Sequence, residues 1–131
     1  MQEPDTGGRV AAAISNAMVG LIADTTGRGP TKARTTIGRD HVLVMLHNTL
    51  TKGERRLAQG GFGEDVLHVR HRFQEVMRPK AMAVIEELVG RRVVAFMSDN
   101  HLDPDVAAEV FVLEAPVDGG ATQLEEAETS G

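Results

Sequence analysis

Residues 41–47 read HVLVMLH, and the five residues between the two histidines are all apolar. A short run of this kind, rich in Val and Leu, predicts a β-strand. A strand with one face in water would alternate between apolar and polar residues, whereas this strand is apolar on both sides. Residues 93–97, VVAFM, have the same character. We therefore expect a sheet with both faces covered, by helices alone or by helices and a second subunit, and we favour a homodimer.

Hydrophobic spacing and turn residues place further elements on both sides of this strand. The expected elements are a helix over residues 9–26, strands over 33–38 and 41–47, helices over 51–59 and 64–89, and strands over 93–97 and 106–113. Helices that do not alternate singly with strands indicate an α+β fold rather than a doubly wound parallel one. The prediction is a two-layer α+β fold with an antiparallel four-stranded sheet, in the order α-β-β-α-α-β-β.

Local signals refine the helical region. Thr51 and Glu54 have the spacing of a capping box, in which hydroxyl and carboxylate satisfy free backbone donors at a helix start. Pro79 cannot donate to the preceding turn, so we expect a kink or break in the long helix. The apolar side expected for its first half consists of Val66, Val69, Phe73, Val76 and Met77. Residues 98–105, SDNHLDPD, are typical of a hairpin loop.

The composition is that of one ordinary domain. The chain has 131 residues, of which 41% are apolar and 25% charged, as in globular proteins generally. Absence of cysteine excludes disulfides, thiolate nucleophiles and Cys-ligated zinc. The ends, residues 1–8 and 115–131, have too few apolar groups to pack. We expect them to be a disordered leader and a disordered acidic tail on a single domain of residues 9–114.

No segment predicts export or membrane insertion. The start, MQEPD, lacks the basic and apolar regions of a secretory signal. The longest uncharged apolar run, residues 10–23, is 14 residues long, which is shorter than the roughly 20 needed to span a bilayer. We expect a soluble, cytoplasmic protein without direct membrane insertion.

Charge is distributed unevenly around a net value of −5. Residues 9–56 carry eight basic and three acidic side chains, whereas residues 98–131 carry nine acidic side chains and neither Lys nor Arg. Such asymmetry can steer an anion or an acidic partner to one face. It can equally be satisfied by pairing within the molecule.

The basic region contains the first candidate site, residues 26–35, TGRGPTKART. It is not a Walker A loop, because it follows a helix and lacks the Gly-Lys-Ser/Thr ending. We expect its side chains to bind an anion or an acidic partner surface, with the guanidinium groups as fork donors. The predicted binding residues are Arg28, Lys32, Arg34, Arg39 and Thr31. The alternative is a turn whose cations pair with the acidic quarter of the chain.

A second candidate loop follows residue 98. It contains Asp99, His101, Asp103 and Asp105, and we expect it to face the basic loop. Its oxygens could hold a hard cation, but the EF-hand spacing is missing and Asx turns explain the same residues. His101 with Asp99 or Asp103 could form an acid/base pair, although no motif ties a nucleophile to it.

Other ligand classes find little support. His68 and His71 have a spacing that suits a metal, but two neighbouring arginines would oppose a cation. Net acidity and the absence of Tyr and Trp argue against nucleic acid. We expect no metal, no cofactor and no catalytic residues.

Three stretches carry a resemblance to a known family: GRGPTKART at 27–35, IGRDHVLVMLHNTLTKGERRL at 37–57 and GRRVVAFMSDNHLDPDVAAEVFVL at 90–113. Together they resemble the MpsC-like family, small bacterial proteins catalogued as a domain of unknown function. The family is named after a sodium-translocating, membrane-potential-generating system linked to inorganic carbon uptake. The resemblance runs from about Ile14 to Leu113 and carries no catalytic residues with it.

The resemblance implies a non-enzymatic accessory or binding protein whose partner is a subunit of a membrane ion or bicarbonate transporter. Two alternatives remain at this point. One is a stand-alone anion- or nucleotide-binding regulatory domain, and the other is a small enzyme that uses His101 with the loop carboxylates.

Overall fold

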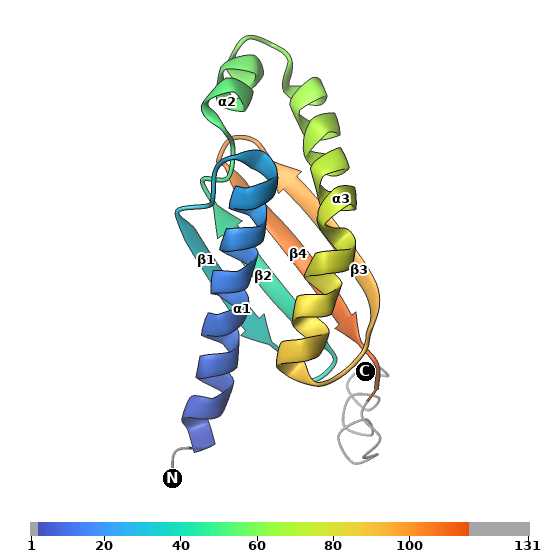
Figure 1. Ribbon diagram of the computed structural model, residues 1–131. Coiled ribbons are helices and arrows are strands. Elements are labelled where there is room, and N and C mark those ends of the chain that lie inside the picture. Colours follow the sequence, from blue (N-terminus) through green and yellow to red (C-terminus); the bar gives the residue numbers. More distant parts are fainter. Residues whose placement is uncertain (1–2, 116–131) are drawn as a thin grey trace, which may run out of the picture.

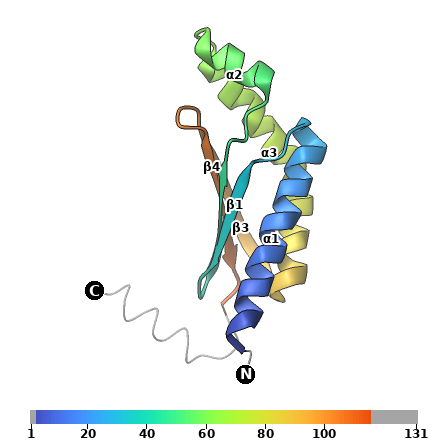
Figure 2. The ribbon, with the colours of Figure 1, turned by 90° about the vertical axis from the view of Figure 1, so that its left-hand side faces the viewer.

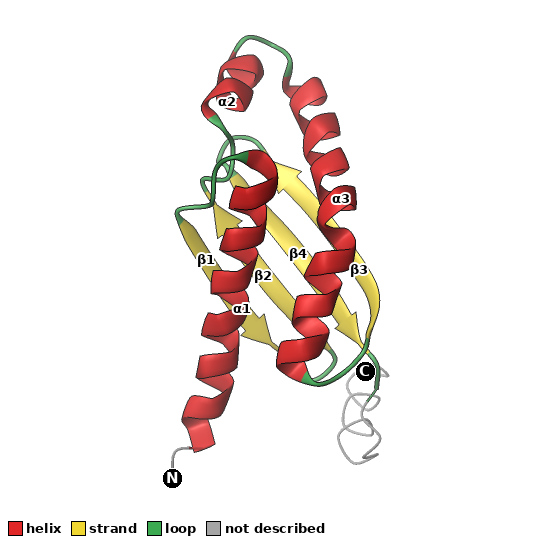
Figure 3. Cartoon of the chain, viewed as in Figure 1, coloured by secondary structure: helices red, strands yellow, loops and turns green. Residues whose placement is uncertain are grey.

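The computed structural model describes residues 3–115, with side chains from residue 7 onward. Its elements are α1 (Glu3–Thr26), β1 (Lys32–Ile37), β2 (His41–His47), α2 (Lys52–Gln59), α3 (Gly63–Val89), β3 (Val93–His101) and β4 (Val106–Leu113). All strand pairs are antiparallel, in the order β1-β2-β4-β3. This confirms the predicted α+β class and order of elements (Figure 3). The predicted tail, 115–131, lies almost entirely outside the described residues.

The two layers are a sheet and a pair of long helices (Figure 1). α1 and α3 lie across the same face of the sheet, and α2 lies beyond its end (Figure 2). The expectation that helices alone cover both faces is wrong, and the alternative, that a second subunit covers the second face, stays a prediction. Among the described residues, no helix or loop covers the other face.

The core lies between the helices and the covered face. In β2 and β4 every second residue is buried, which places Val42, Val44 and Leu46 in the same buried layer as Phe111. α1 contributes Ile14, Met18 and Ile22, spaced by four residues, as the predicted apolar stripe requires. The rings of Phe96 and Phe111 lie 4.8 Å apart at their centroids, a separation typical of favourable aromatic pairs.

The long helix differs from its prediction in two ways. α3 is continuous through Pro79, so the expected break is wrong. Pro79 lies on the exposed side, where water can satisfy the carbonyl that its missing N–H leaves free. Val69 and Val76 are 43% and 69% exposed, which also contradicts the predicted apolar side. The buried residues are Val66, Arg70, Gln74, Met77, Ala81 and Ile85.

The element boundaries follow from local chemistry. The capping box is confirmed, since the Thr51 hydroxyl accepts from the Glu54 amide and the Glu54 carboxylate accepts from the Thr51 amide. Gly90 ends α3 with φ 79°, a conformation that favours glycine. α1 begins at Glu3, within the segment expected to be disordered. β3 extends to His101 because it pairs with β4 along its length, so the predicted loop at 98–105 is shorter than expected.

Replacing Pro79 by Ala should stabilise the protein. Ala restores a backbone donor at an exposed helix position, and proline in a helix interior costs about 3 kcal/mol relative to alanine. We expect urea unfolding to give a free energy of unfolding higher by roughly 1–3 kcal/mol. Lys80→Ala, on the neighbouring exposed position, is the control and should change it by less than about 0.5 kcal/mol. An unchanged or lower value for Pro79→Ala would show that the ring itself is needed.

Candidate functional site

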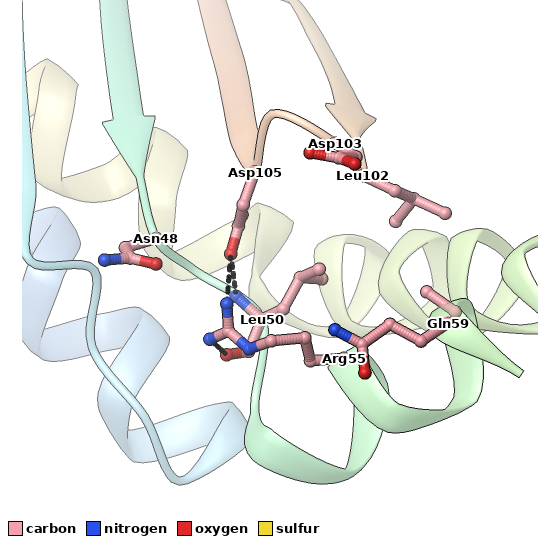
Figure 4. Close-up of a pocket in the computed structure, with 8 residues that line it drawn as sticks. Asn48, Leu50, Arg55, Gln59, Leu102, Asp103 and Asp105 are labelled. Atoms are coloured by element: carbon pink, nitrogen blue, oxygen red, sulfur yellow. Dashed lines mark hydrogen bonds and ion pairs between the residues drawn. The ribbon is translucent and has the colours of Figure 1, made fainter.

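Three connections meet at one end of the sheet. β2 and β3 end there, and β1 and β4 begin there, since Lys32, His47, Val106 and His101 pair in one row. The α1–β1 loop, the β2–α2 loop and the β3–β4 hairpin therefore come together. The latter two and α2 enclose a cavity of about 480 Å³. It is lined by Asn48, Leu50, Arg55, Ala58, Gln59, Leu102, Asp103 and Asp105 (Figure 4).

Asp105 fixes the β2–α2 loop in place. Its Oδ1 accepts from the Thr49 amide at 3.0 Å and the Thr49 hydroxyl at 3.1 Å, and its Oδ2 accepts from the Leu50 amide at 3.0 Å. Its carbonyl accepts from the Asn48 amide at 3.0 Å. Asn48 has φ 62°, a left-handed conformation that Asn adopts more readily than most residues. Asp105 therefore acts as a structural anchor, with donors on both oxygens.

Arg55 provides the positive charge of the cavity. Its Nη2 donates to the Leu50 carbonyl at 3.2 Å, and its Nη1 lies 4.0 Å from Asp105 Oδ2. The side chain is 40% exposed. A guanidinium has five N–H donors, so most of those of Arg55 remain open to a ligand. They suit a carboxylate or a phosphate, which a guanidinium can bind through two parallel hydrogen bonds.

A buried ion pair lies beneath the same loop. Arg70 Nη1 donates to Glu54 Oε1 at 3.1 Å and to the Thr49 carbonyl at 3.4 Å. The two side chains are 4% and 10% exposed. Thr49 thus bonds to Arg70 through its carbonyl and to Asp105 through its amide and hydroxyl. Thr49 therefore connects Asp105, in the wall of the cavity, to the buried Arg70–Glu54 ion pair.

Glu109 is the unpaired member of this polar core. It lies on the helix-facing side of β4, opposite Ser98, and is 4% exposed. Within the described residues, Glu109 Oε1, Ser98 Oγ and Asn100 Oδ1 are buried without hydrogen-bond partners, as is Arg70 Nε. Burial raises the pKa of Glu109 to about 7, and the charge of Arg70 opposes that rise.

The predicted anion-binding residues do not gather at one place. Arg28 lies at this end of the sheet, where its Nε donates to the Asn48 carbonyl at 3.3 Å, and the Thr31 amide donates to the His47 carbonyl at 3.0 Å. Lys32 and Arg34 project from β1 on the face away from the helices. Arg39 lies at the other end of β1, where its carbonyl accepts from Arg91 at 2.8 Å.

The second predicted loop is likewise divided. Asp99 and His101 are part of β3 and share the face away from the helices, whereas Asp103 and Asp105 line the cavity. His101 Nδ1 lies 2.9 Å from the Pro104 carbonyl. Within the described residues, it makes no hydrogen bond to Asp99 or Asp103. The expected approach of the two loops holds for Arg28, because Arg28 and Asp105 both bond to the backbone of Asn48.

Sequence reasoning missed Arg55, Arg70 and Glu109. For two of them the sequence did carry a signal, namely their position in the periodic pattern of buried residues along a strand or a helix. Glu109 falls on the same side of β4 as Phe111, and Arg70 falls on the same side of α3 as Val66. A charged residue in phase with a buried stripe indicates a polar group in the core. Arg55 had no such signal, since its role depends on loops distant in sequence.

The chain is similar to one protein family and to one uncharacterized bacterial protein. The model of the family described as "Na⁺-translocating membrane potential-generating system (MpsC)" matches residues 6–115. The uncharacterized protein YrhF of Bacillus subtilis (strain 168) is 24% identical over 94 residues, which cover 70% of this chain and 77% of YrhF. No solved structure matches. Between residues 3 and 115, no helix has the length and apolarity that crossing a membrane requires.

Replacing Asp105 by Asn should destabilise the fold. The amide nitrogen that replaces one carboxylate oxygen would face backbone N–H groups, and charge-assisted hydrogen bonds would be lost. Hydrogen bonds to charged groups contribute about 1.5–3 kcal/mol each, so we expect urea unfolding to show a loss of about 2–3 kcal/mol. Asp103→Asn, at an exposed position in the same hairpin, should change stability by less than about 0.5 kcal/mol. Equal small losses in both variants would contradict the anchoring role.

Glu109 should make stability depend on pH. Its folded pKa of about 7 exceeds the value of about 4.3 for an unfolded Glu. The folded chain therefore keeps a proton that the unfolded chain has lost. As the pH rises from about 4.5 to 7, the free energy of unfolding should fall, and Glu109 should account for roughly 3 kcal/mol of that fall.

Glu109→Gln removes this titration, because the amide stays neutral. We compare the free energy of unfolding of the variant with that of wild type at each pH. This difference should favour the variant by about 2–3 kcal/mol more at pH 8 than at pH 5. Urea unfolding at both values measures the difference, and Glu87→Gln at an exposed position of α3 is the control. A Glu109→Gln variant equally affected at both pH values would show that Glu109 is ionised in the folded protein throughout.

Proposed function

Because the chain belongs to the MpsC family, we propose that it is a non-enzymatic accessory component of a membrane-associated Na⁺-translocating system. In this role it acts in the cytoplasm by binding a subunit that spans the membrane, and inorganic carbon uptake is the transport process that it serves. The observation that carries the proposal is the family match over residues 6–115, which include all four strands and α3.

The partner-binding region that we propose is the end of the sheet around the cavity. Arg28 and Arg55 each donate one hydrogen bond to a backbone carbonyl, and Arg55 also lies 4.0 Å from the Asp105 carboxylate, so both guanidinium groups have further donors for a ligand. A carboxylate-bearing segment of a partner would find guanidinium groups there. Lys32, in the first pair of β1, adds a cation to the same end. Thr31 lies in the loop before β1, and its exposed hydroxyl would be a further hydrogen-bonding group for the partner.

The charges of the cavity favour a protein segment over a nucleotide. Asp103 and Asp105 line it together with Arg55, and two carboxylates would repel a triphosphate. A peptide of mixed charge can place an acidic group against Arg55 and a donor against Asp103. A nucleotide, the ligand of the stand-alone regulatory alternative, is therefore less suited to this cavity than a segment of a protein partner.

Loss of the partner contact should lower the membrane potential that the system sustains. In cells lacking the chain, we expect a smaller Na⁺-dependent potential, measured with a potential-sensitive dye, and slower bicarbonate uptake. Wild type should restore both, and the double variant Arg28→Gln/Arg55→Gln should not, although it folds. Lys80→Gln on α3 is the control and should restore both. An undiminished potential in the deletion strain would contradict the accessory role.

A binding measurement separates this function from the stand-alone alternative. Purified full chain should sediment with inside-out membrane vesicles that contain the transport system, and less so as salt increases. The double variant should sediment at least about tenfold less. Calorimetric titration of the chain with ATP and with inorganic phosphate should give no binding tighter than millimolar. Micromolar binding of either would favour the regulatory domain instead.

A further inference from the structure

The face of the sheet away from the helices is uncovered within residues 3–115 (Figure 2). We call it the open face. Alternation along the strands fixes its members, because their neighbours point into the core. Its apolar residues are Leu43, Met45, Ala95, Met97, Val106, Ala108, Val110 and Val112. Met97 is 54% exposed, and a patch of this kind on a globular protein marks an interaction site.

Charges lie at the two edges of the open face and have opposite signs. Arg34 pairs with Met45, Met45 with Ala108, and Ala108 with Asp99. These four residues form one row across the sheet, with a cation on β1 and an anion on β3. Lys32 lies in the next row on the cationic edge. The face therefore has a largely apolar centre, two cations on its β1 edge and one carboxylate, Asp99, on its β3 edge.

We propose that the open face binds a second copy of this chain, related to the first by a twofold axis parallel to the strands. Such an axis brings the β1 edge of one subunit over the β3 edge of the other. Arg34 then lies opposite Asp99 of the partner subunit, at the same height along the strands, and the symmetry creates this pair twice. In the same row, Met45 lies over the partner's Ala108, so a large side chain meets a small one.

Other orientations are less favourable. A twofold axis perpendicular to the strands would place β1 over β1 and β3 over β3. With such an axis near the row of Arg34, Arg34 would approach its own counterpart, and Asp99 would approach Asp99 of the partner subunit. Like charges brought together at an interface suppress that arrangement. Charge complementarity therefore selects the axis as well as the partner.

The dimensions of the open face limit the surface area that a dimer can bury. Four strands, about 4.8 Å apart, and seven residues per strand, rising about 3.3 Å each, give a face of roughly 19 by 23 Å. Two such faces would bury on the order of 900 Å² together, which is at the lower end for a specific complex. The dimer should therefore dissociate on dilution. This inference does not depend on the proposed transport role.

Sedimentation velocity of the full chain between 1 and 200 μM tests the contact. We expect a mass approaching twice 14.1 kDa at the upper end. Met45→Asp should raise the dissociation constant at least about 100-fold, while circular dichroism and urea unfolding confirm that the variant folds. A monomer at every concentration, or a dimer that survives Met45→Asp, would overturn the proposal.

A charge exchange tests the axis. Arg34→Asp and Asp99→Arg should each raise the dissociation constant at least about tenfold, and the double variant should return it to within about threefold of wild type. Lys80→Asp, the same kind of charge change on the helical layer, is the control and should leave it unchanged. Failure of the double variant to restore binding would overturn the proposed geometry.

Crosslinking gives an independent readout, since the chain has no cysteines. Sheets pack about 10 Å apart, so a bifunctional maleimide of similar reach should join subunits of the variant Arg34→Cys/Asp99→Cys. Arg34→Cys alone should stay uncrosslinked. Efficient crosslinking of Arg34→Cys alone would place β1 against β1 and overturn the parallel axis.

Discussion

The register between β2 and β4 determines where every other element of this protein lies. These central strands are separated in sequence by α2, α3 and β3, yet Val42, Val44 and Leu46 pair with Phe111, Glu109 and Ala107. Both strands are apolar on both sides, so the hydrophobic pattern alone would tolerate a slip of one residue. Asp105 removes that freedom. Its carboxylate holds the residues that follow β2 against the residue that precedes β4, and the register follows from this polar anchor.

Buried charged and titratable groups near this end of the sheet and along β4 oppose folding. Arg70, Glu54 and Glu109 are charged or titratable groups inside the molecule, and desolvating such groups is unfavourable unless partners compensate. Arg70 and Glu54 compensate each other and cap the loop backbone. Glu109 has no hydrogen-bond partner among the described residues, and because burial raises its pKa to about 7, it avoids the full cost by keeping its proton below that pH. The core is therefore apolar under α1 and polar under the first half of α3.

The sequence predicts a structural feature well where neighbouring residues determine it, and poorly where tertiary contacts do. The strand at 41–47, the capping box at Thr51 and the stop at Gly90 depend on neighbouring residues, and the structure agrees with all three. The break expected at Pro79 does not occur, because Pro79 lies on the exposed side of α3, and which side of a helix faces water is a tertiary property. The candidate site was foretold only in part. The density of basic residues near Arg28 was visible, but the distance between Arg28 and Arg39 depends on the length of β1, and the contacts of Asp105 with Thr49 join residues far apart in the chain.

The cavity lies at the end of the sheet where β2 and β3 end. Rotation about an axis parallel to the strands leaves the strand direction unchanged, so both subunits of the proposed dimer would carry their cavities at the same end. Two equal sites at one end can engage two copies of a partner at once, or two segments of one partner. Linked binding of this kind raises the effective concentration for the second contact, so that individually weak contacts give durable attachment. A small chain with shallow charged cavities could in this way remain bound to a large assembly and still be released one contact at a time.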